Sequence, residues 1–184
     1  IYYSKPATGD GNVGIGTATP RALLDVNGSV RQQHPVMLTI KGSVRDSTNL
    51  NDPFGVFVSG RYAYVASLAG NRLTVVDVSR SDAPVVVGSV SDAVNLVNVR
   101  NVFVSGRYAY VTVGDVNRFS VVDVSNPSSP VVVGSLQSKD LNGSMGLIVS
   151  GRYAFVDVNG VSGPGANRLT VVDVSNPSSP VVVG

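Results

Sequence analysis

The sequence has no cysteine and no tryptophan, and only 14% of its 184 residues are charged. The absence of cysteine excludes disulfides and thiolate chemistry, and it fits either a reducing compartment or a secreted protein that relies on β-sheet alone. Because charged residues fall below the roughly 25% usual for soluble domains, we expect a neutral polar surface of the kind that suits extracellular and fibrous proteins. The net charge of +2 comes from scattered residues, which disfavours nucleic acid or an anionic membrane surface as a partner.

Long apolar runs are also missing. No segment approaches the ~18 to 20 residues of a membrane helix, so we expect no insertion into a membrane, and no part of the sequence resembles a signal peptide. The sequence begins at Ile1 and stops at Gly184 partway through a repeat junction. We therefore expect a processed or incomplete piece of a longer protein.

The sequence contains one stretch that occurs three times. The stretch from Val56 to Val90 recurs from Val102 to Leu136 and, slightly altered, from Leu147 to Gly184, with a period of about 45 residues. A fragment at 36–44 matches the last part of the same unit. Such a period is typical of stacked or radially arranged units that cannot bury their apolar faces alone.

Each unit reads as four short strands. In the first copy they are expected at Val56–Val58, Arg61–Ala66, Arg72–Val78 and Pro84–Val90, with Ser59-Gly60 as the first turn. Four strands in about 45 residues is the size of one β-propeller blade, and runs of consecutive valines indicate strands that are covered on both faces. The predicted fold class is all-β: three four-stranded propeller-type blades at about 55–90, 101–136 and 146–184, with a lone outer strand at 36–44.

A different segment precedes the repeats. Residues 1–33 are expected to form an arm and a short β segment for oligomerisation or anchoring, ahead of a partial propeller at 34–184. Strands are expected around Val13 and Ile15 and around Leu24 and Val26, joined by a Thr-Pro turn. A segment with so few apolar side chains has to pack on something else.

The run GNVGIGTATPRALLDVNG resembles the GNVGIGTxxPxxxLDVxG segment of phage tail-fibre and tail-spike proteins and of large bacterial surface proteins. The resemblance implies a homotrimeric, intertwined β region, often near a self-cleaving chaperone domain, with the side chains of Val13, Ile15, Leu24 and Val26 facing the trimer axis. The alternative is a β-hairpin that packs against its own propeller.

The repeated unit itself, VSGRYAYV followed by NRLxVVDVSNPSSPVVVG, resembles the LVIVD repeat, a family of bacterial and archaeal surface-associated β-propellers. This resemblance covers roughly residues 36–184. It implies an extracellular, non-catalytic propeller with no catalytic residues to carry over. We therefore expect no enzyme activity, no catalytic, cofactor-binding or metal-binding residues, and no cofactor.

Two sets of charged residues recur at equivalent positions of the blades. The repeated aspartates are expected to cap the turn that follows them, because an Asp before Val-Ser can accept hydrogen bonds from the amides of that turn. The repeated arginines are expected to pair with these aspartates or with carbonyl groups inside each blade. The aspartates are Asp77, Asp123 and Asp173, and the arginines are Arg61, Arg107, Arg152, Arg72, Arg118 and Arg168.

Other motifs do not support a chemical site. The lone His34 has no partners at ligand spacing, and Asp157-Val158-Asn159-Gly160 lacks the acidic residues of a calcium loop. The GxG at Asn12–Gly16 has neither a long strand before it nor a helix after it, so it does not indicate a nucleotide site.

The sequence favours a fibre or surface-filament subunit outside the cell, on a cell or virion surface, which presents blades for assembly or adhesion. Its expected partner is itself, as a homotrimer or filament. The alternative is a receptor- or glycan-binding head of a phage tail fibre that uses the variable loops between the second and third strands. Because three blades do not close a ring, either more blades follow Gly184 or several chains combine, and the first is preferred.

Overall fold

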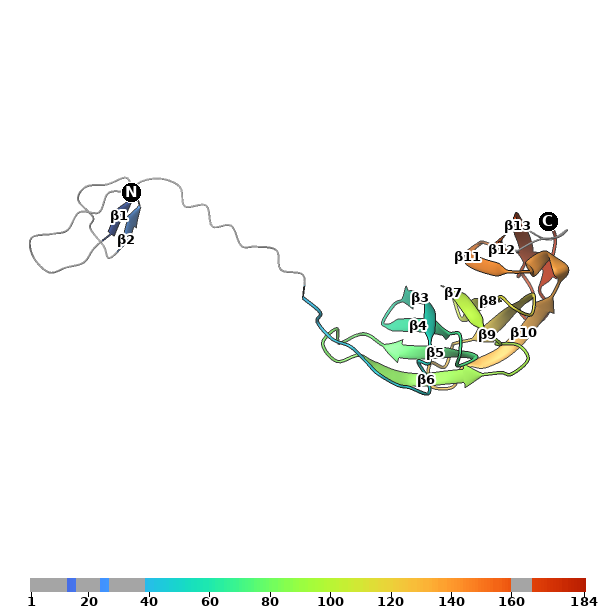
Figure 1. Cartoon of the computed structure of the whole chain (residues 1–184), viewed down its shortest axis with the longest axis horizontal. Helices are drawn as coiled ribbons and strands as arrows, with labels where there is room; N and C mark the ends of the chain where they lie inside the picture. The colour runs from blue at the N-terminus through green and yellow to red at the C-terminus, as the bar shows by residue number, and fades with distance from the viewer. Residues whose placement is uncertain (1–12, 16–23, 27–38, 160–166) are drawn as a thin grey trace, which may run out of the picture. The chain divides into compact units, whose positions relative to one another are not determined.

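The structure is a computed structural model, and it describes residues 13–15, 24–26, 39–159 and 167–184 (Figure 1). The chain divides into two compact units, Ile1–Thr39 and Ile40–Gly184. Each unit is described by itself.

The described residues of the N-terminal unit form one strand pair. Strands β1 (Val13–Ile15) and β2 (Leu24–Val26) pair in parallel, with Val13 opposite Leu24. The two strands therefore lie where the sequence predicts them. The hairpin alternative is wrong, because the strands of a hairpin are antiparallel. The predicted Thr-Pro turn lies outside the described residues, as do the side chains of Val13, Ile15 and Leu24, and Val26 is half-buried.

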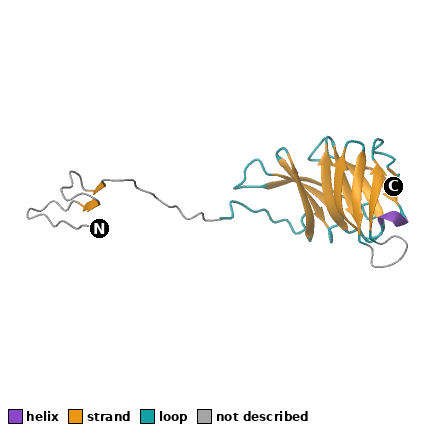
Figure 2. Cartoon of the chain, turned by 90° about the horizontal axis from the view of Figure 1, so that it is seen from above, coloured by secondary structure: helices purple, strands orange, loops and turns teal. Residues whose placement is uncertain are grey.

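In the described part of the second unit, each repeat forms one four-stranded antiparallel sheet, which gives three sheets (Figures 1 and 2). Blade 1 contains β3 (Pro53–Ser59), β4 (Tyr62–Ser67), β5 (Arg72–Asp77) and β6 (Val85–Ser91). Blade 2 contains β7 (Val99–Ser105), β8 (Tyr108–Val113), β9 (Arg118–Asp123) and β10 (Val131–Gln137). Blade 3 contains β11 (Ser144–Ser150), β12 (Tyr153–Val158), β13 (Arg168–Asp173) and β14 (Val181–Val182). The predicted fold class is confirmed.

The strand limits differ from the predicted ones for local reasons. Ser59 pairs with Tyr62, so the first turn is Gly60-Arg61 and not the predicted Ser59-Gly60. Gly60 has a φ of 59°, which suits the first turn position of a two-residue hairpin. The first strand of each blade is longer than predicted and contains a bulge, such as the one between Pro53 and Gly55. A short 3-10 helix, η1 (Lys139–Leu141), lies in the loop that enters blade 3.

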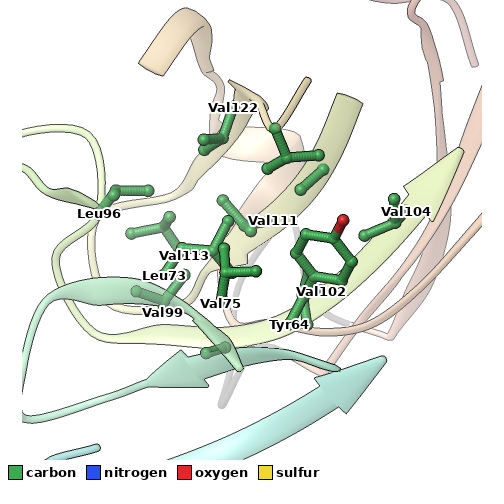
Figure 3. Close-up of a cluster of buried hydrophobic side chains, with 13 residues drawn as sticks. Tyr64, Leu73, Val75, Leu96, Val99, Val102, Val104, Val111, Val113 and Val122 are labelled. Carbon is green, nitrogen blue, oxygen red and sulfur yellow. The ribbon is translucent and has the colours of Figure 1, made fainter. Parts of the chain in front are cut away.

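The hydrophobic cores lie between blades, not inside them. Strand β7 contacts β3 and β4 of blade 1, and β11 contacts β7 and β8 of blade 2. Figure 3 shows the first core, in which Tyr64, Leu73 and Val75 of blade 1 meet Val102 and other side chains of blade 2. A second core joins blades 2 and 3 around Phe119. Full burial of one such side chain contributes about 1.5 to 3 kcal/mol, so each blade depends on its neighbour.

The fragment before blade 1 occupies the place of an outer strand. A Cβ on Gly42 would collide with the backbone at Ser81, just as one on Gly88 would collide with Pro127 and one on Gly134 with the backbone after β13. Its described part, from Thr39 on, forms no sheet pairing with the other described residues. The described part of the predicted lone outer strand, residues 39–44, is therefore unpaired within the described part of the chain.

Candidate functional site

The repeated aspartates lie where the third strand of each blade ends. Asp77 Oδ1 accepts a hydrogen bond from the backbone N–H of Ser79 at 2.9 Å, and Asp123 and Asp173 accept the equivalent bond at the same distance. The predicted turn-capping role is confirmed. The second carboxylate oxygen of Asp77 pairs with Arg61. The guanidinium group, followed by the bonds from Ser79, lowers the pKa of Asp77 from 3.8 to about 2.

The same arrangement recurs in the other two blades. Arg107 pairs with Asp123 and Arg152 with Asp173, and these bonds lower the pKa of both aspartates to about 2. Each arginine also lies over the next tyrosine, with 5.4 Å between the Arg61 guanidinium carbon and the Tyr62 ring centroid. A shallow pocket of about 320 Å³ adjoins this pair in blade 1, and one of about 350 Å³ occupies the same place in blade 2. Because the groups are identical in every blade, they do not form one convergent site.

The second series of arginines does not contact the repeated aspartates. Arg72 Nη1 donates to Asn49 Oδ1 at 3.1 Å and to Ser89 Oγ at 2.8 Å. Arg118 contacts Asn95 in the same way, and Arg168 pairs with Asp140. Of the two kinds of partner that were expected, Arg72 and Arg118 therefore have carbonyl groups, those of the Asn49 and Asn95 side chains, and not the repeated aspartates. These arginines hold the loop that leads into their own blade.

A cluster of unlike side chains forms at the inner edge between blades 2 and 3. Arg100 Nη2 donates to Asp115 Oδ1 at 2.6 Å, and Arg100 Nη1 contacts Met145 Sδ at 3.2 Å. Asn98 Nδ2 donates to Asp115 Oδ2 at 2.6 Å, and Asn98 N donates to Asn71 of the blade 1 loop. The cluster thus joins elements of all three blades.

Sequence reasoning missed this cluster, although a signal for it was available. Arg100 breaks the repeat, since Phe54 and Met145 occupy the equivalent positions of the first strand in blades 1 and 3. Asp115 likewise lies in the variable loop after the second strand. Both residues differ between blades, which is what a single convergent site requires.

The end blades each leave one face open. We call the face toward the preceding blade the trailing face, and the face toward the following blade the leading face. On the trailing face Val56 of blade 1 is 65% exposed, whereas its equivalent Val102 is 2% exposed. On the leading face Leu169 of blade 3 is 62% exposed, whereas its equivalents Leu73 and Phe119 are fully buried. The open faces are therefore the unfilled counterparts of the two cores.

The remaining motifs lie mainly outside the described residues. His34 and residues 12 and 16 of the GxG motif lie outside the described residues, and so does Gly160 of the loop that begins at Asp157. Asp157 Oδ1 accepts the backbone N–H of Gly146. In the described ranges, no three His, Cys, Asp or Glu residues gather as metal ligands would. No helix in those ranges has the length and apolarity needed to cross a membrane.

Four-stranded antiparallel sheets that pack face to face in sequence order, with the cores between them, define a β-propeller repeat protein. The repeats are of one recognisable kind. The chain belongs to the LVIVD repeat family, because LVIVD repeats match residues 54–92, 98–138 and 143–184. A comparison with curated proteins finds no match.

Several solved structures are similar to the chain. A functionally unknown protein from Desulfotomaculum acetoxidans is 19% identical with a TM-score of 0.58, and the match covers 74% of this chain and 43% of that protein. The periplasmic gluconolactonase of Pseudomonas aeruginosa is 18% identical with a TM-score of 0.58, covering 72% and 40%. A candidate 6-phosphogluconolactonase from Bacteroides uniformis is 13% identical with a TM-score of 0.60, covering 82% and 46%. The chain spans less than half the length of these proteins, and the likeness shows the fold alone.

The expectation that the chain is not an enzyme is contradicted by these neighbours. A periplasmic gluconolactonase shares the fold, so a propeller of this kind does not by itself indicate a protein without catalytic activity. The blades also bring unlike charged residues together. Arg100 and Asp115 are unlike residues that converge on one rim.

Proposed function

We propose that the chain is a subunit of an extracellular fibre or surface filament, on a cell or virion surface, which presents LVIVD blades for assembly or adhesion. The match of three LVIVD repeats to most of the chain supports this proposal most directly. Each repeat buries its apolar surface against its neighbours, and such units are suited to building arrays.

Self-association through residues 1–33 is a further part of the proposal. It rests on the GNVGIGTxxPxxxLDVxG pattern and on the parallel pairing of β1 and β2, which suits strands that run side by side in an intertwined fibre. Light scattering on the full chain tests it, with a trimer or larger assembly as the expected mass. A monomer at every concentration would refute it.

Exposure outside the cell is tested separately. Antibodies raised against the blades should label intact cells or virions without permeabilisation, with an antibody against a cytoplasmic protein as the negative control. Labelling that appears only after permeabilisation would contradict the extracellular assignment.

A second candidate is binding of a receptor or glycan at the rim formed by the loops after the second strands. The convergence of Arg100, Asp115 and Asn98 favours this candidate, because all three differ from their equivalents in the other blades. Arg100 is only 21% exposed, so its guanidinium group is held in a fixed place. Binding sites develop on variable loops over a constant scaffold.

Arg100→Gln tests this candidate, because it removes the charge and leaves a polar side chain in the cluster. Binding to a glycan array or to host cells should fall for Arg100→Gln and stay unchanged for Arg80→Gln. Arg80 is the matched control, since it is exposed and lies at the opposite end of blade 1. Equal binding by both variants and the unmodified chain would remove the candidate.

A further inference from the structure

The turn between the third and fourth strands forms a shallow pocket at one end of the blade. In blade 2 this pocket has a volume of about 350 Å³ and is lined by Asp123, Ser125, Asn126, Ser129, Val131 and Val133. We call it the turn pocket. Every residue that lines it belongs to blade 2, so its shape does not depend on a neighbouring blade.

Capping of the turn accounts for only part of this arrangement. The bond from Ser125 N to Asp123 closes the turn. Three further side chains beside it reach solvent: Arg107 is 58% exposed, Val131 is 53% exposed, and Tyr108 is half-buried under the guanidinium group. The strand register places Tyr108, Asp123 and Val131 side by side on one face of the sheet. An aromatic ring, an ion pair and an apolar side chain therefore form one accessible row.

Blade 3 repeats the blade 2 arrangement. Arg152 pairs with Asp173 and lies over the next tyrosine. Asn176 Oδ1 accepts the N–H of Ser178 at 3.2 Å and its hydroxyl group at 2.8 Å, and Asn126 accepts the same two bonds at 3.3 and 2.8 Å. The six positions of the turn pocket hold the same amino acids in blade 3, namely Asp173, Ser175, Asn176, Ser179, Val181 and Val183.

Blade 1 keeps the ion pair but changes the wall of the pocket. Arg80 stands where blade 2 has Asn126, and Ala83 stands where blade 2 has Ser129. Arg80 pairs with Asp82 of the same turn. The pocket of blade 1 therefore lacks the amide group and one hydroxyl group of the other two, which makes it an internal comparison within the same chain.

We propose that the turn pockets of blades 2 and 3 are two equivalent sites for a neutral polysaccharide, each of which holds one sugar unit. This inference goes beyond the assembly role, and its sites are separate from the cluster at Arg100. Because the two sites are identical, a ligand that occupies both at once must itself repeat, as a polysaccharide does.

The chemistry of the turn pocket suits hydroxyl groups rather than a charged ligand. Arg107 and Asp123 neutralise each other, so the pocket offers no net charge to an ionic group. The Oδ1 atom of Asn126 is occupied by Ser128, which leaves the Nδ2 amino group to donate to a ligand. The serine hydroxyl groups both donate and accept, as sugar hydroxyl groups do. The two valines of the pocket provide an apolar surface for the C–H face of a sugar ring.

The two sites are held at a fixed separation. A Cβ on Gly134 of blade 2 would collide with the Pro177 carbonyl, so the turn of blade 3 rests directly on the outer strand of blade 2. A polysaccharide bound in one turn pocket therefore meets the second at a constant distance. Binding to both raises the affinity without any new kind of contact.

Affinity electrophoresis of the full chain in native gels tests the proposal. Separate gels contain dextran, a galactomannan, a mixed-linkage β-glucan or heparin. At least one of the three neutral polysaccharides should retard the chain. If none of them does, or if only the anionic heparin does, the proposal is overturned.

Arg107→Gln and Arg152→Gln each test one site, because the change breaks the ion pair and uncovers the tyrosine ring. Each variant should bind the retarding polysaccharide about tenfold more weakly, and the double variant should not be retarded. Arg61→Gln is the matched control, since it makes the same change in blade 1 and should leave the affinity unchanged. Thermal unfolding confirms that the variants are folded. Equal effects of Arg107→Gln and Arg61→Gln would contradict the assignment.

A gain of binding is expected in blade 1. Arg80→Asn combined with Ala83→Ser gives this blade the amide and hydroxyl groups of the other turn pockets. A third site should raise the affinity for the same polysaccharide about fivefold. An unchanged affinity would show that these groups do not bind the ligand, and the proposed site would be wrong.

These measurements separate the inference from the proposed function. Arg107→Gln should leave the mass from light scattering unchanged, so a loss of assembly cannot imitate a loss of binding. Arg100→Gln alters only the inner cluster and should leave the retardation unchanged. A loss in Arg100→Gln without one in Arg107→Gln would support binding at the inner rim and overturn the turn pockets.

Discussion

Blade 2 and the two end blades share nearly the same repeat, yet their side chains have different surroundings. Blade 2 is covered on both faces, and five of the six residues of β8 are buried. In blade 3 the equivalent strand β12 has only three buried residues. The difference comes from position in the stack, because the interior of this protein consists of contacts between neighbouring repeats. A residue in this fold is a core residue only when a blade lies next to it.

The largest expected effect is the difference in stability between Phe119→Ala and Leu169→Ala. Phe119 is fully buried between blades 2 and 3, so its truncation should lower the free energy of unfolding by about 3 to 5 kcal/mol. Leu169 occupies the same repeat position but is exposed, and its truncation should change stability by about 0.5 kcal/mol or less. Urea unfolding, measured at concentrations where the chain does not associate, checks both values. Similar losses for the two variants would break the comparison.

Gly134→Ala against Gly184→Ala tests the outer edge of the stack. A Cβ on Gly134 would collide with the Pro177 carbonyl, so this change should cost about 1 to 3 kcal/mol through overpacking. A Cβ on Gly184 meets only Val171 side-chain atoms at 3.9 Å, and no loss is expected there. Thermal unfolding of the two variants checks the difference. If Gly134→Ala did not lower the stability, the backbone at Gly134 and the turn at Pro177 could move apart without cost.

Thr112→Val tests the polar contact between blades. The change removes the hydroxyl group that accepts a hydrogen bond from the Asn101 N–H and donates one to the Met145 carbonyl oxygen. It should lower the free energy of unfolding by about 1 to 2 kcal/mol. Thr74→Val, in blade 1, is a control inside one blade, since Thr74 donates to Asn49 O of its own entry loop. Hydrogen exchange should show faster opening of β11 in Thr112→Val only.

The smallest effect is expected where the blades do not differ. The pKa of Asp77, Asp123 and Asp173 is lowered to about 2, so the stability from these groups is complete above pH 3.8 and is lost as the pH falls toward 2. Asp77→Asn and Asp123→Asn should each reduce this acid dependence by the same amount. Urea midpoints measured from pH 5 to pH 2 check this. A larger change for Asp123→Asn would mean that neighbouring blades influence these arginine–aspartate pairs.

Much of the fold could be predicted from the sequence because the repeat supplies three readings of the same unit. The four strands of each blade follow from alternation and turn residues, and the covering of both faces follows from the runs of valine. The capping role of Asp77 was predictable because its partner, Ser79, is only two residues away.

What could not be predicted depends on contacts distant in sequence. Arg72 reaches Asn49 across 23 positions, and nothing in the local pattern distinguishes it from Arg61, which pairs inside its hairpin. The cluster at Arg100 required knowledge of which loops meet at the inner edge. The parallel pairing of β1 and β2 was also missed, since two short strands separated by a turn signal favour a hairpin.

The glycine contact at the outer edge has a geometric consequence. Gly88 and Gly134 allow the backbone of one blade to touch the turn of the next, and a Cβ at either position would push the outer edges apart. The angle between successive blades depends on two spacings. One is the distance between neighbouring blades at this outer edge, and the other is their distance at the inner edge, where β3, β7 and β11 lie. The glycines therefore fix the curvature of any array built from this unit, and with it the number of blades needed to complete a circle.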